Sequence, residues 1–298
     1  MSIESRLVLG TAQLGMPYGI ANTTGQPDLS QARDIIRTGW ENGIHQFDTA
    51  QAYASSESVL GLALQELGLT NEAKIITKPH PNLDHLKPEA LSRAVESSLY
   101  RLKVPSLYCL MLHSESFLDI LDRGLKDILF NITYVGHAKY IGVSVYSPEK
   151  ALQAINSDVI DFIQLPTNVL DRRFEKAGVF NLAVAKKKKI YIRSVFLQGL
   201  ILMRESEIPE SLEFAKPALK ILDKLAKEFG MARQEMALGY VKQKFAHAKI
   251  VFGAETPKQV SDTVSAWMAD AMNSIPNKLE ESFSSVDERI LNPSLWSC

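Results

Sequence analysis

Short runs of apolar and β-branched residues alternate along the chain with longer segments whose apolar positions recur at helical spacing. The runs predict strands at 6–10, 44–47, 74–78, 107–112, 139–144, 160–164, 189–194 and 249–252. The segments between them predict helices at 30–43, 56–68, 88–102, 116–136, 148–157, 173–187, 213–229 and 257–269. In the third helix Leu91, Val95 and Leu102 share one face, and Pro88 suits the first turn.

A strand followed by a helix, repeated eight times, indicates parallel strands joined by right-handed crossovers. Eight such units in 298 residues favour an α/β fold of one domain, a single (β/α)8 TIM barrel over residues 1–298, rather than a doubly wound sheet with a second domain. Two stretches depart from this alternation of strands and helices. One is a long loop after strand 7, from Leu197 to Leu212, which we expect to cover a substrate or cofactor. The other is a C-terminal helical tail, with a helical piece near 276–291.

Composition excludes several classes of function. The formal net charge of −1 gives no electrostatic footprint for nucleic acid or an anionic membrane surface. Cys109 and Cys298 do not form a disulfide framework, which indicates a reducing compartment. The histidines lack metal-ligand spacing, so we expect no metal site. With no apolar run near twenty residues and no secretory core at the start, we expect a cytoplasmic monomer or small homo-oligomer.

Four chemically active residues fall where predicted strands end: Asp48 and Tyr53 after the second strand, Lys78 after the third and His113 after the fourth. In a parallel barrel these ends share one rim, where the chemistry of such barrels takes place. A lysine ammonium held charged by an aspartate would lower the pKa of a neighbouring tyrosine, which would then donate a proton. A neutral histidine could hold a carbonyl oxygen in line with that phenol. The set predicts a proton-transfer site that requires a cofactor for any reduction.

Each of these residues also has an ordinary structural interpretation. Asp48 could cap the following helix. Tyr53 could be an aromatic residue of the rim, and Lys78 a solvated loop residue. His113 could be a hydrogen-bonded structural histidine. The hypothesis of a site depends on all four residues occupying successive strand ends.

Several segments resemble the aldo-keto reductase family, in order and over nearly the whole chain. They are GTAQLG at 10–15, FDTAQAYASSESVLGLAL at 47–64, ITK at 76–78, SSLYRLKVPSLYCLMLH at 97–113, KYIGVSVYSPE at 139–149, FIQLPTNVLDRR at 162–173 and IVFGAETPKQVSDTVSA at 250–266. The resemblance implies a barrel that binds NADPH or NADH and reduces an aldehyde or ketone. It implies that Tyr53 is the general acid, Lys78 its partner, Asp48 the partner of Lys78, and His113 the carbonyl-orienting group.

The resemblance also implies a set of cofactor-binding residues. Gly10 and Thr11 would lie under the cofactor, and Ser144 and Gln164 would hold the nicotinamide carboxamide. The loop with Ser194, Leu197 and Gly199 would cover the pyrophosphate. Gly253, Glu255 and Gln259 would hold the adenosine end, where Thr256 and Pro257 resemble an N-cap followed by a first-turn proline.

The sequence departs from the family pattern in three ways. Val145 stands where many members have an asparagine, and Arg193 where an aromatic residue stacks on the nicotinamide. The charge of Arg193 should disfavour the oxidised, cationic cofactor, which favours net reduction. Gly253, Glu255 and Gln259 stand where basic residues often bind the adenosine 2′-phosphate. We therefore expect NADH to be accepted, with a weaker preference for NADPH than is usual.

The leading hypothesis is an NAD(P)H-dependent oxidoreductase acting on a small-molecule carbonyl substrate, with a sugar or sugar-derived compound as one candidate. A second is a redox-sensing regulatory subunit of the same fold that binds the cofactor and turns over slowly. A third is a barrel lyase that uses Lys78 as a Schiff-base amine.

Overall fold

A closed barrel of eight parallel strands forms the centre of the protein, in a computed structural model that describes residues 6–269 and 276–296. Each strand pairs with its neighbours in sequence, and β8 closes the barrel against β1. The strands are β1 Leu7–Gly10, β2 Gln46–Asp48, β3 Lys74–Thr77, β4 Leu107–Leu112, β5 Ala138–Ser144, β6 Phe162–Pro166, β7 Lys189–Arg193 and β8 Lys249–Gly253. All eight predicted strands are confirmed, with ends that differ by at most two residues. Cys298 lies outside the described residues.

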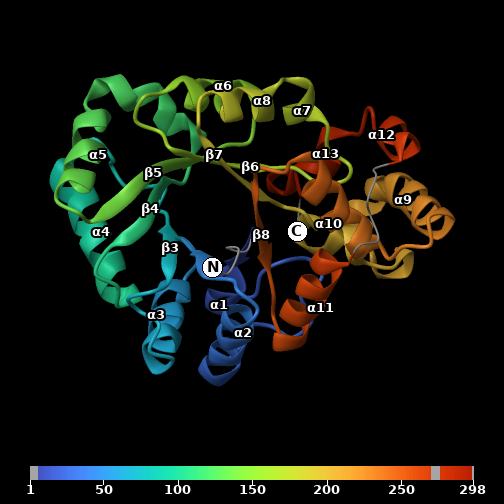
Figure 1. Cartoon of the computed structure of the whole chain (residues 1–298), viewed down its shortest axis with the longest axis horizontal. Coiled ribbons are helices and arrows are strands. Elements are labelled where there is room, and N and C mark those ends of the chain that lie inside the picture. The colour runs from blue at the N-terminus through green and yellow to red at the C-terminus, as the bar shows by residue number, and fades with distance from the viewer. Residues whose placement is uncertain (1–5, 270–275, 297–298) are drawn as a thin grey trace.

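Helices surround the barrel (Figure 1). The longer ones are α2 Leu29–Glu41, α3 Ser56–Glu66, α4 Pro88–Leu102, α5 Leu125–Tyr134, α6 Pro148–Asn156, α8 Val179–Ala185, α9 Lys216–Glu228, α10 Arg233–Lys244 and α11 Pro257–Met268. The short ones are α1 Ala12–Gly15, α7 Arg173–Lys176, α12 Asn277–Ser282 and α13 Glu288–Leu291. The 3-10 helices are η1 Glu115–Arg123, η2 Leu197–Leu202, η3 Glu205–Glu207, η4 Glu210–Ala215 and η5 Pro293–Leu295.

The helix predictions need correction at three kinds of place. Two predicted helices are each divided by a glycine of positive φ: η1 and α5 meet at Gly124 (φ 107), and α7 and α8 at Gly178 (φ 74). The sequence prediction missed α1 and α10. In α10 the buried residues fall in two short runs rather than at helical spacing along one face, so the amphipathic pattern is weak: Met236, Ala237, Leu238, Tyr240 and Val241. The long loop after β7 contains 3-10 turns.

The core has two layers, one inside the barrel and one between the barrel and the helices. The inner layer is a small cluster of buried side chains: Val8, Ile76, Cys109, Met111, Phe162, Tyr191 and Val251. Phe162 stacks on Tyr191 with ring centroids 5.1 Å apart, and Tyr191 donates a hydrogen bond to Gln46 at 2.9 Å. Cys109 is fully buried and its pKa is raised by that burial, so it is an inert core thiol.

The C-terminal helices pack against the side of the barrel that carries α9 and α10 (Figure 1). Lys278 forms an ion pair with Glu228 of α9, and Lys244 of α10 forms one with Glu280. Arg172 donates a hydrogen bond to the carbonyl of Leu279 at 3.4 Å. These contacts fix the tail, predicted as one helical piece near 276–291, as the two helices α12 and α13. Within the described residues no helix combines the length and apolarity that crossing a membrane requires.

Candidate active site

The four predicted catalytic residues lie together at the C-terminal rim of the barrel. Asp48 is the last residue of β2, and Lys78 and His113 directly follow β3 and β4. Tyr53 lies in the turn between β2 and α3. The parallel register pairs Asp48 with Gly10 on one side and Ile76 on the other, so these strand ends are level. The sequence therefore predicted correctly that each of the four residues lies at or just after the C-terminal end of a strand.

Asp48 and Lys78 form a buried ion pair. Lys78 Nζ donates to both carboxylate oxygens of Asp48 at 2.7 Å each, and to the carbonyl of Thr49 at 3.0 Å. Gln164 Nε2 donates to Asp48 Oδ1 at 2.8 Å. Lys78 is 0% exposed and Asp48 4% exposed. The pair satisfies both charges, so Lys78 is not a solvated loop residue. Nor is Asp48 a helix cap, since the N-cap of α3 is Ser55.

Glycine and hydroxyl residues of the first two β-α connections fix the turn that carries Tyr53. A Cβ at Gly15 would lie 1.9 Å from the carbonyl oxygen of Tyr53, so only glycine permits α1 to pack this closely. Beneath the turn, the Ser56 hydroxyl lies 2.9 Å from those of both Thr11 and Thr49. These buried hydrogen bonds join the segment GTAQLG to the turn that follows β2.

Tyr53 lies close to both Lys78 and His113. Lys78 Nζ is 5.4 Å from the centroid of the Tyr53 ring. The His113 ring meets the Tyr53 ring edge-on, with centroids 5.8 Å apart and an interplanar angle of 86°. A phenol, an ammonium, a carboxylate and an imidazole are thus gathered as the sequence predicted.

The expected lowering of the Tyr53 pKa is wrong for this structure. Burial raises the pKa of Tyr53 well above its usual value, and the negative charge of Asp48 raises it further. The positive charge of Arg193 opposes that shift without overcoming it. Tyr53 consequently keeps its proton at neutral pH.

His113 is neutral, as expected. Burial lowers the pKa of His113 to about 3, and the positive charges of Lys78 and Arg193 contribute. Its Nδ1 atom is buried without a hydrogen-bond partner in the described parts of the chain. A neutral imidazole can donate from one ring nitrogen and accept at the other, so the site retains an uncommitted hydrogen-bonding group.

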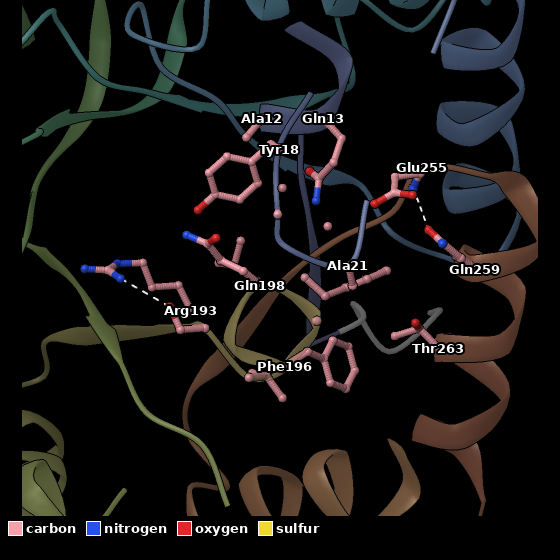
Figure 2. Close-up of a pocket in the computed structure, with 18 of the residues that line it drawn as sticks. Ala12, Gln13, Tyr18, Ala21, Arg193, Phe196, Gln198, Glu255, Gln259 and Thr263 are labelled. Atoms are coloured by element: carbon pink, nitrogen blue, oxygen red, sulfur yellow. Dashed lines mark hydrogen bonds between the residues drawn. The ribbon is translucent and has the colours of Figure 1, made fainter. Parts of the chain in front are cut away.

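A cavity of about 410 Å³ is lined by Asp48 and Tyr53 and also by Glu255 and Gln259. Figure 2 shows Glu255 and Gln259 at one end of it, with Tyr18 and Arg193 towards the other. The predicted residues that line it are Gly10, Thr11, Asp48, Tyr53, Gln164, Arg193, Ser194, Gly199, Gly253, Glu255 and Gln259. Four predicted residues do not line it: Lys78, His113, Ser144 and Leu197. Lys78 donates to Asp48, which lines the cavity, and the Leu197 side chain is fully buried in the hydrophobic core.

Gln198, in the loop expected to cover the pyrophosphate, also lines the cavity. The sequence assigned no role to several other lining residues, among them Gln13, Tyr18, Ala21, Phe196, Gln234, Asp262 and Thr263. Some signal for them existed, because Gln13 lies in GTAQLG and Phe196 in the loop after β7. A Cβ at Gly253 would lie 2.1 Å from Gln13 Nε2, so the end of the Gln13 side chain lies directly against the backbone of β8.

The loop after β7 adopts a strained conformation at the cavity. Ser194, Leu197 and Gln198 have positive φ values of 61, 47 and 53°, although none is glycine. Gly199 follows at φ 96°, where a Cβ would lie 2.3 Å from that of Ala21. The Ala21 amide donates to the Gln198 carbonyl at 3.4 Å, which links this loop to the loop after β1.

The far end of the cavity lies at the N-terminus of α11. The Thr256 side chain accepts from the Gln259 amide at 3.2 Å, which confirms the predicted N-cap. Glu255 accepts a hydrogen bond from Thr24 at 3.2 Å, and burial raises its pKa. Asp262 also lines this end and pairs with Lys258 at 2.6 Å. This end of the cavity is acidic.

Arg193 at the end of β7 does not stand free in the cavity. Its guanidinium carbon lies 4.2 Å from the centroid of the Tyr146 ring, so the two groups stack. Across the described residues, no group of three or more histidines, cysteines and carboxylates is placed to hold a metal ion.

Comparisons with known proteins agree with this geometry. The sequence model of the Aldo/keto reductase family matches residues 6–279. The chain is 22% identical over 328 residues to L-glyceraldehyde 3-phosphate reductase of Escherichia coli O157:H7, covering 98% of this chain and 92% of that protein. It is 30% identical over 96 residues to a putative voltage-gated potassium channel subunit beta of Schizosaccharomyces pombe, covering 29% of this chain and 28% of that protein. The holo form of an aldo-keto reductase from Bacillus halodurans matches with a TM-score of 0.74 at 21% identity, covering 98% of this chain and 94% of that chain.

Proposed function

The chain belongs to the aldo/keto reductase family and is an NAD(P)H-dependent oxidoreductase, and we propose that it reduces an aldehyde or ketone with Tyr53 as the proton donor. The observation that carries the proposal is the gathering of Asp48, Tyr53, Lys78 and His113 at one rim, next to a cavity. A single cavity also connects Tyr53 with the N-terminus of α11, as a dinucleotide with two functional ends requires.

In this mechanism Tyr53 Oη transfers its proton to the carbonyl oxygen as negative charge develops there. Neutral His113 fits the role of orienting that oxygen, since it can donate a hydrogen bond without competing for the proton. The ion pair of Lys78 and Asp48 keeps a fixed dipole beneath the phenol. A reduced nicotinamide, when bound, supplies the hydride.

Residues along the cavity support a cofactor site. Gly10 and Gly253 give the rim a close backbone approach, and the loop from Ser194 to Gly199 lies along one wall. Gln164 uses its Nε2 atom on Asp48, which leaves Oε1 as the atom to accept from a carboxamide. Ser144 lies beside it in the strand register, although it does not line the cavity.

The acidic far end supports acceptance of NADH. A carboxylate such as Glu255 accepts a hydrogen bond from a ribose hydroxyl but repels a 2′-phosphate. Lys258, the one basic residue of the segment 253–259, is 81% exposed and already paired with Asp262. NADPH therefore gains no preformed basic clamp at this end from the described residues.

Small aldehydes, including phosphorylated and sugar-derived ones, are the first substrates to test, because one relative is named for reducing L-glyceraldehyde 3-phosphate. The positive charge of Arg193 beside the site favours the reduced cofactor and thus net reduction. The decisive experiment is a screen of aldehydes, ketones and reducing sugars with NADH and with NADPH, followed at the nicotinamide absorbance. Absence of turnover on every carbonyl with both cofactors would contradict the proposal.

A redox-sensing regulatory subunit is the second candidate, because the chain resembles a putative potassium channel subunit over 96 residues. Steady-state turnover on 4-nitrobenzaldehyde distinguishes the two functions. An enzyme completes many cycles per minute, whereas a sensor binds the cofactor tightly and releases the oxidised form slowly.

A further inference from the structure

Arg193 is the only basic side chain that lines the cavity in the described part of the protein. Four carboxylates line it as well, and each has a donor of its own: Asp48, Glu207, Glu255 and Asp262. Arg193, in contrast, forms no ion pair with any carboxylate of residues 6–269 or 276–296. A partly buried cation without a counter-ion is costly, and such groups are typical of binding sites.

Neutral groups hold the guanidinium in place. Nη1 donates to the Ser194 hydroxyl at 3.3 Å and Nη2 to the Val145 carbonyl at 3.4 Å, both long hydrogen bonds. Tyr146 covers one face of the planar group. Stacking occupies a face and leaves the in-plane N–H groups able to donate. Arg193 is therefore positioned by its neighbours while most of its hydrogen-bonding capacity is unused by the described residues.

This cation lies at the catalytic end of the cavity. Figure 2 shows the Arg193 side chain on the same side as Tyr18 and Gln198, opposite Glu255 and Gln259. Tyr53 lines the same cavity, and the charge of Arg193 opposes the rise in the Tyr53 pKa and adds to the lowering of the His113 pKa. A ligand group bound by Arg193 would thus be a close neighbour of a carbonyl placed at Tyr53, and far from the end that suits adenosine.

We propose that Arg193 is a specificity-determining residue that binds an anionic group on the substrate, so that the enzyme prefers carbonyl compounds carrying a carboxylate or a phosphate. The inference rests on the proposed reduction of a carbonyl at the same site. The arginine fork binds either anion through two parallel hydrogen bonds. The Tyr18 hydroxyl and the Gln198 amide, which line the same end, add neutral donors. The bound anion also supplies the counter-ion that the protein does not.

The first test compares matched neutral and anionic aldehydes. 4-Nitrobenzaldehyde against 4-carboxybenzaldehyde tests the carboxylate, and glyceraldehyde against glyceraldehyde 3-phosphate tests the phosphate. In Arg193→Gln, the ratio of kcat/KM for the anionic to the neutral partner should fall at least about tenfold, mainly through KM, as expected on loss of a charge-assisted hydrogen bond. Arg193→Lys, which keeps the charge but not the fork, should restore part of the ratio.

Lys126→Gln serves as the control, since it removes one positive charge from the outer face of α5, where Lys126 pairs with Asp122 and Asp158. It should leave the ratio unchanged. An equal effect of Arg193→Gln and Lys126→Gln, or a wild-type enzyme that does not prefer either anionic aldehyde, would overturn the inference. Which of the two pairs responds identifies the anion as carboxylate or phosphate.

A binding measurement separates this inference from the proposed function. Calorimetric dissociation constants for 4-carboxybenzaldehyde and 4-nitrobenzaldehyde need no turnover. A preference for the carboxylate that disappears in Arg193→Gln supports the anion site even if no carbonyl is reduced. Turnover of neutral aldehydes with no such preference would support the reductase activity and contradict the anion site.

Discussion

Lys78 donates a hydrogen bond to each carboxylate oxygen of Asp48, at 2.7 Å, with both side chains almost completely buried. The ammonium thereby has its charge balanced within the protein, 5.4 Å from the centroid of the Tyr53 ring. Burial raises the pKa of Tyr53, and the negative charge of Asp48 raises it further. The site holds a protonated phenol above a fixed ion pair.

Removing one member of the ion pair should destabilise the fold strongly. Asp48→Asn leaves the Lys78 ammonium buried without its counter-ion, at an expected cost of about 3–5 kcal/mol in the free energy of unfolding. Urea denaturation at neutral pH measures the loss. The double variant Asp48→Asn/Lys78→Met removes both charges and should recover much of it. A single variant within about 1 kcal/mol of wild type would show that water reaches the pair.

Replacing the phenol should abolish chemistry without affecting the fold. Tyr53→Phe removes only the hydroxyl, so turnover should fall by at least about a hundredfold while cofactor affinity stays within about twofold. Steady-state kinetics and quenching of nicotinamide fluorescence measure the two effects. Tyr100→Phe, at a residue 86% exposed on α4, is the matched control and should behave as wild type. Retention of turnover within about tenfold in Tyr53→Phe would exclude Tyr53 as the acid.

The buried neutral histidine should make stability depend on pH. The pKa of His113 is lowered from its usual 6.5 to about 3 in the folded protein, so the unfolded chain binds an extra proton between those values. Its contribution to stability is therefore complete above about pH 6.5 and is lost as the pH falls towards 3. Urea midpoints at pH 7 and pH 5 should differ less in His113→Gln than in wild type. His247→Gln, at an exposed histidine, should show the wild-type difference.

The acidic end of the cavity should control cofactor choice. Glu255→Gln removes a negative charge beside the proposed adenosine site, and about 1 kcal/mol of lost repulsion corresponds to roughly fivefold tighter NADPH binding relative to NADH. Dissociation constants for both cofactors, from nicotinamide fluorescence, give the ratio. Glu213→Gln, on η4 with a side chain 60% exposed, is the control. Wild-type protein that already binds NADPH a hundredfold tighter than NADH would defeat the assignment.

Local sequence patterns were enough to predict the barrel and the positions of the proposed catalytic residues at its strand ends. Alternation of strand and helix patterns identifies all eight strands, and parallel strands bring their C-terminal ends to one rim. Asp48, Lys78 and His113 each end or follow a strand, so their meeting follows from sequence position alone. The capping residues Thr256 and Pro257 are equally local signals. By contrast, α10 was missed because its apolar residues do not recur at the spacing of an amphipathic helix.

What only the tertiary structure decided is how these groups interact, because burial and distance between remote segments set their energies. Gln164 reaches Asp48 across 116 positions of sequence, and Thr24 reaches Glu255 across 231. The sequence contained the lysine and the tyrosine, but the direction of the shift in the Tyr53 pKa depends on burial and on the nearby charge of Asp48. Likewise Arg193 was visible as a departure from the family pattern. Its stacking on Tyr146 and the absence of an ion pair among the described residues are visible only in the folded structure, which brings these loops together at the rim.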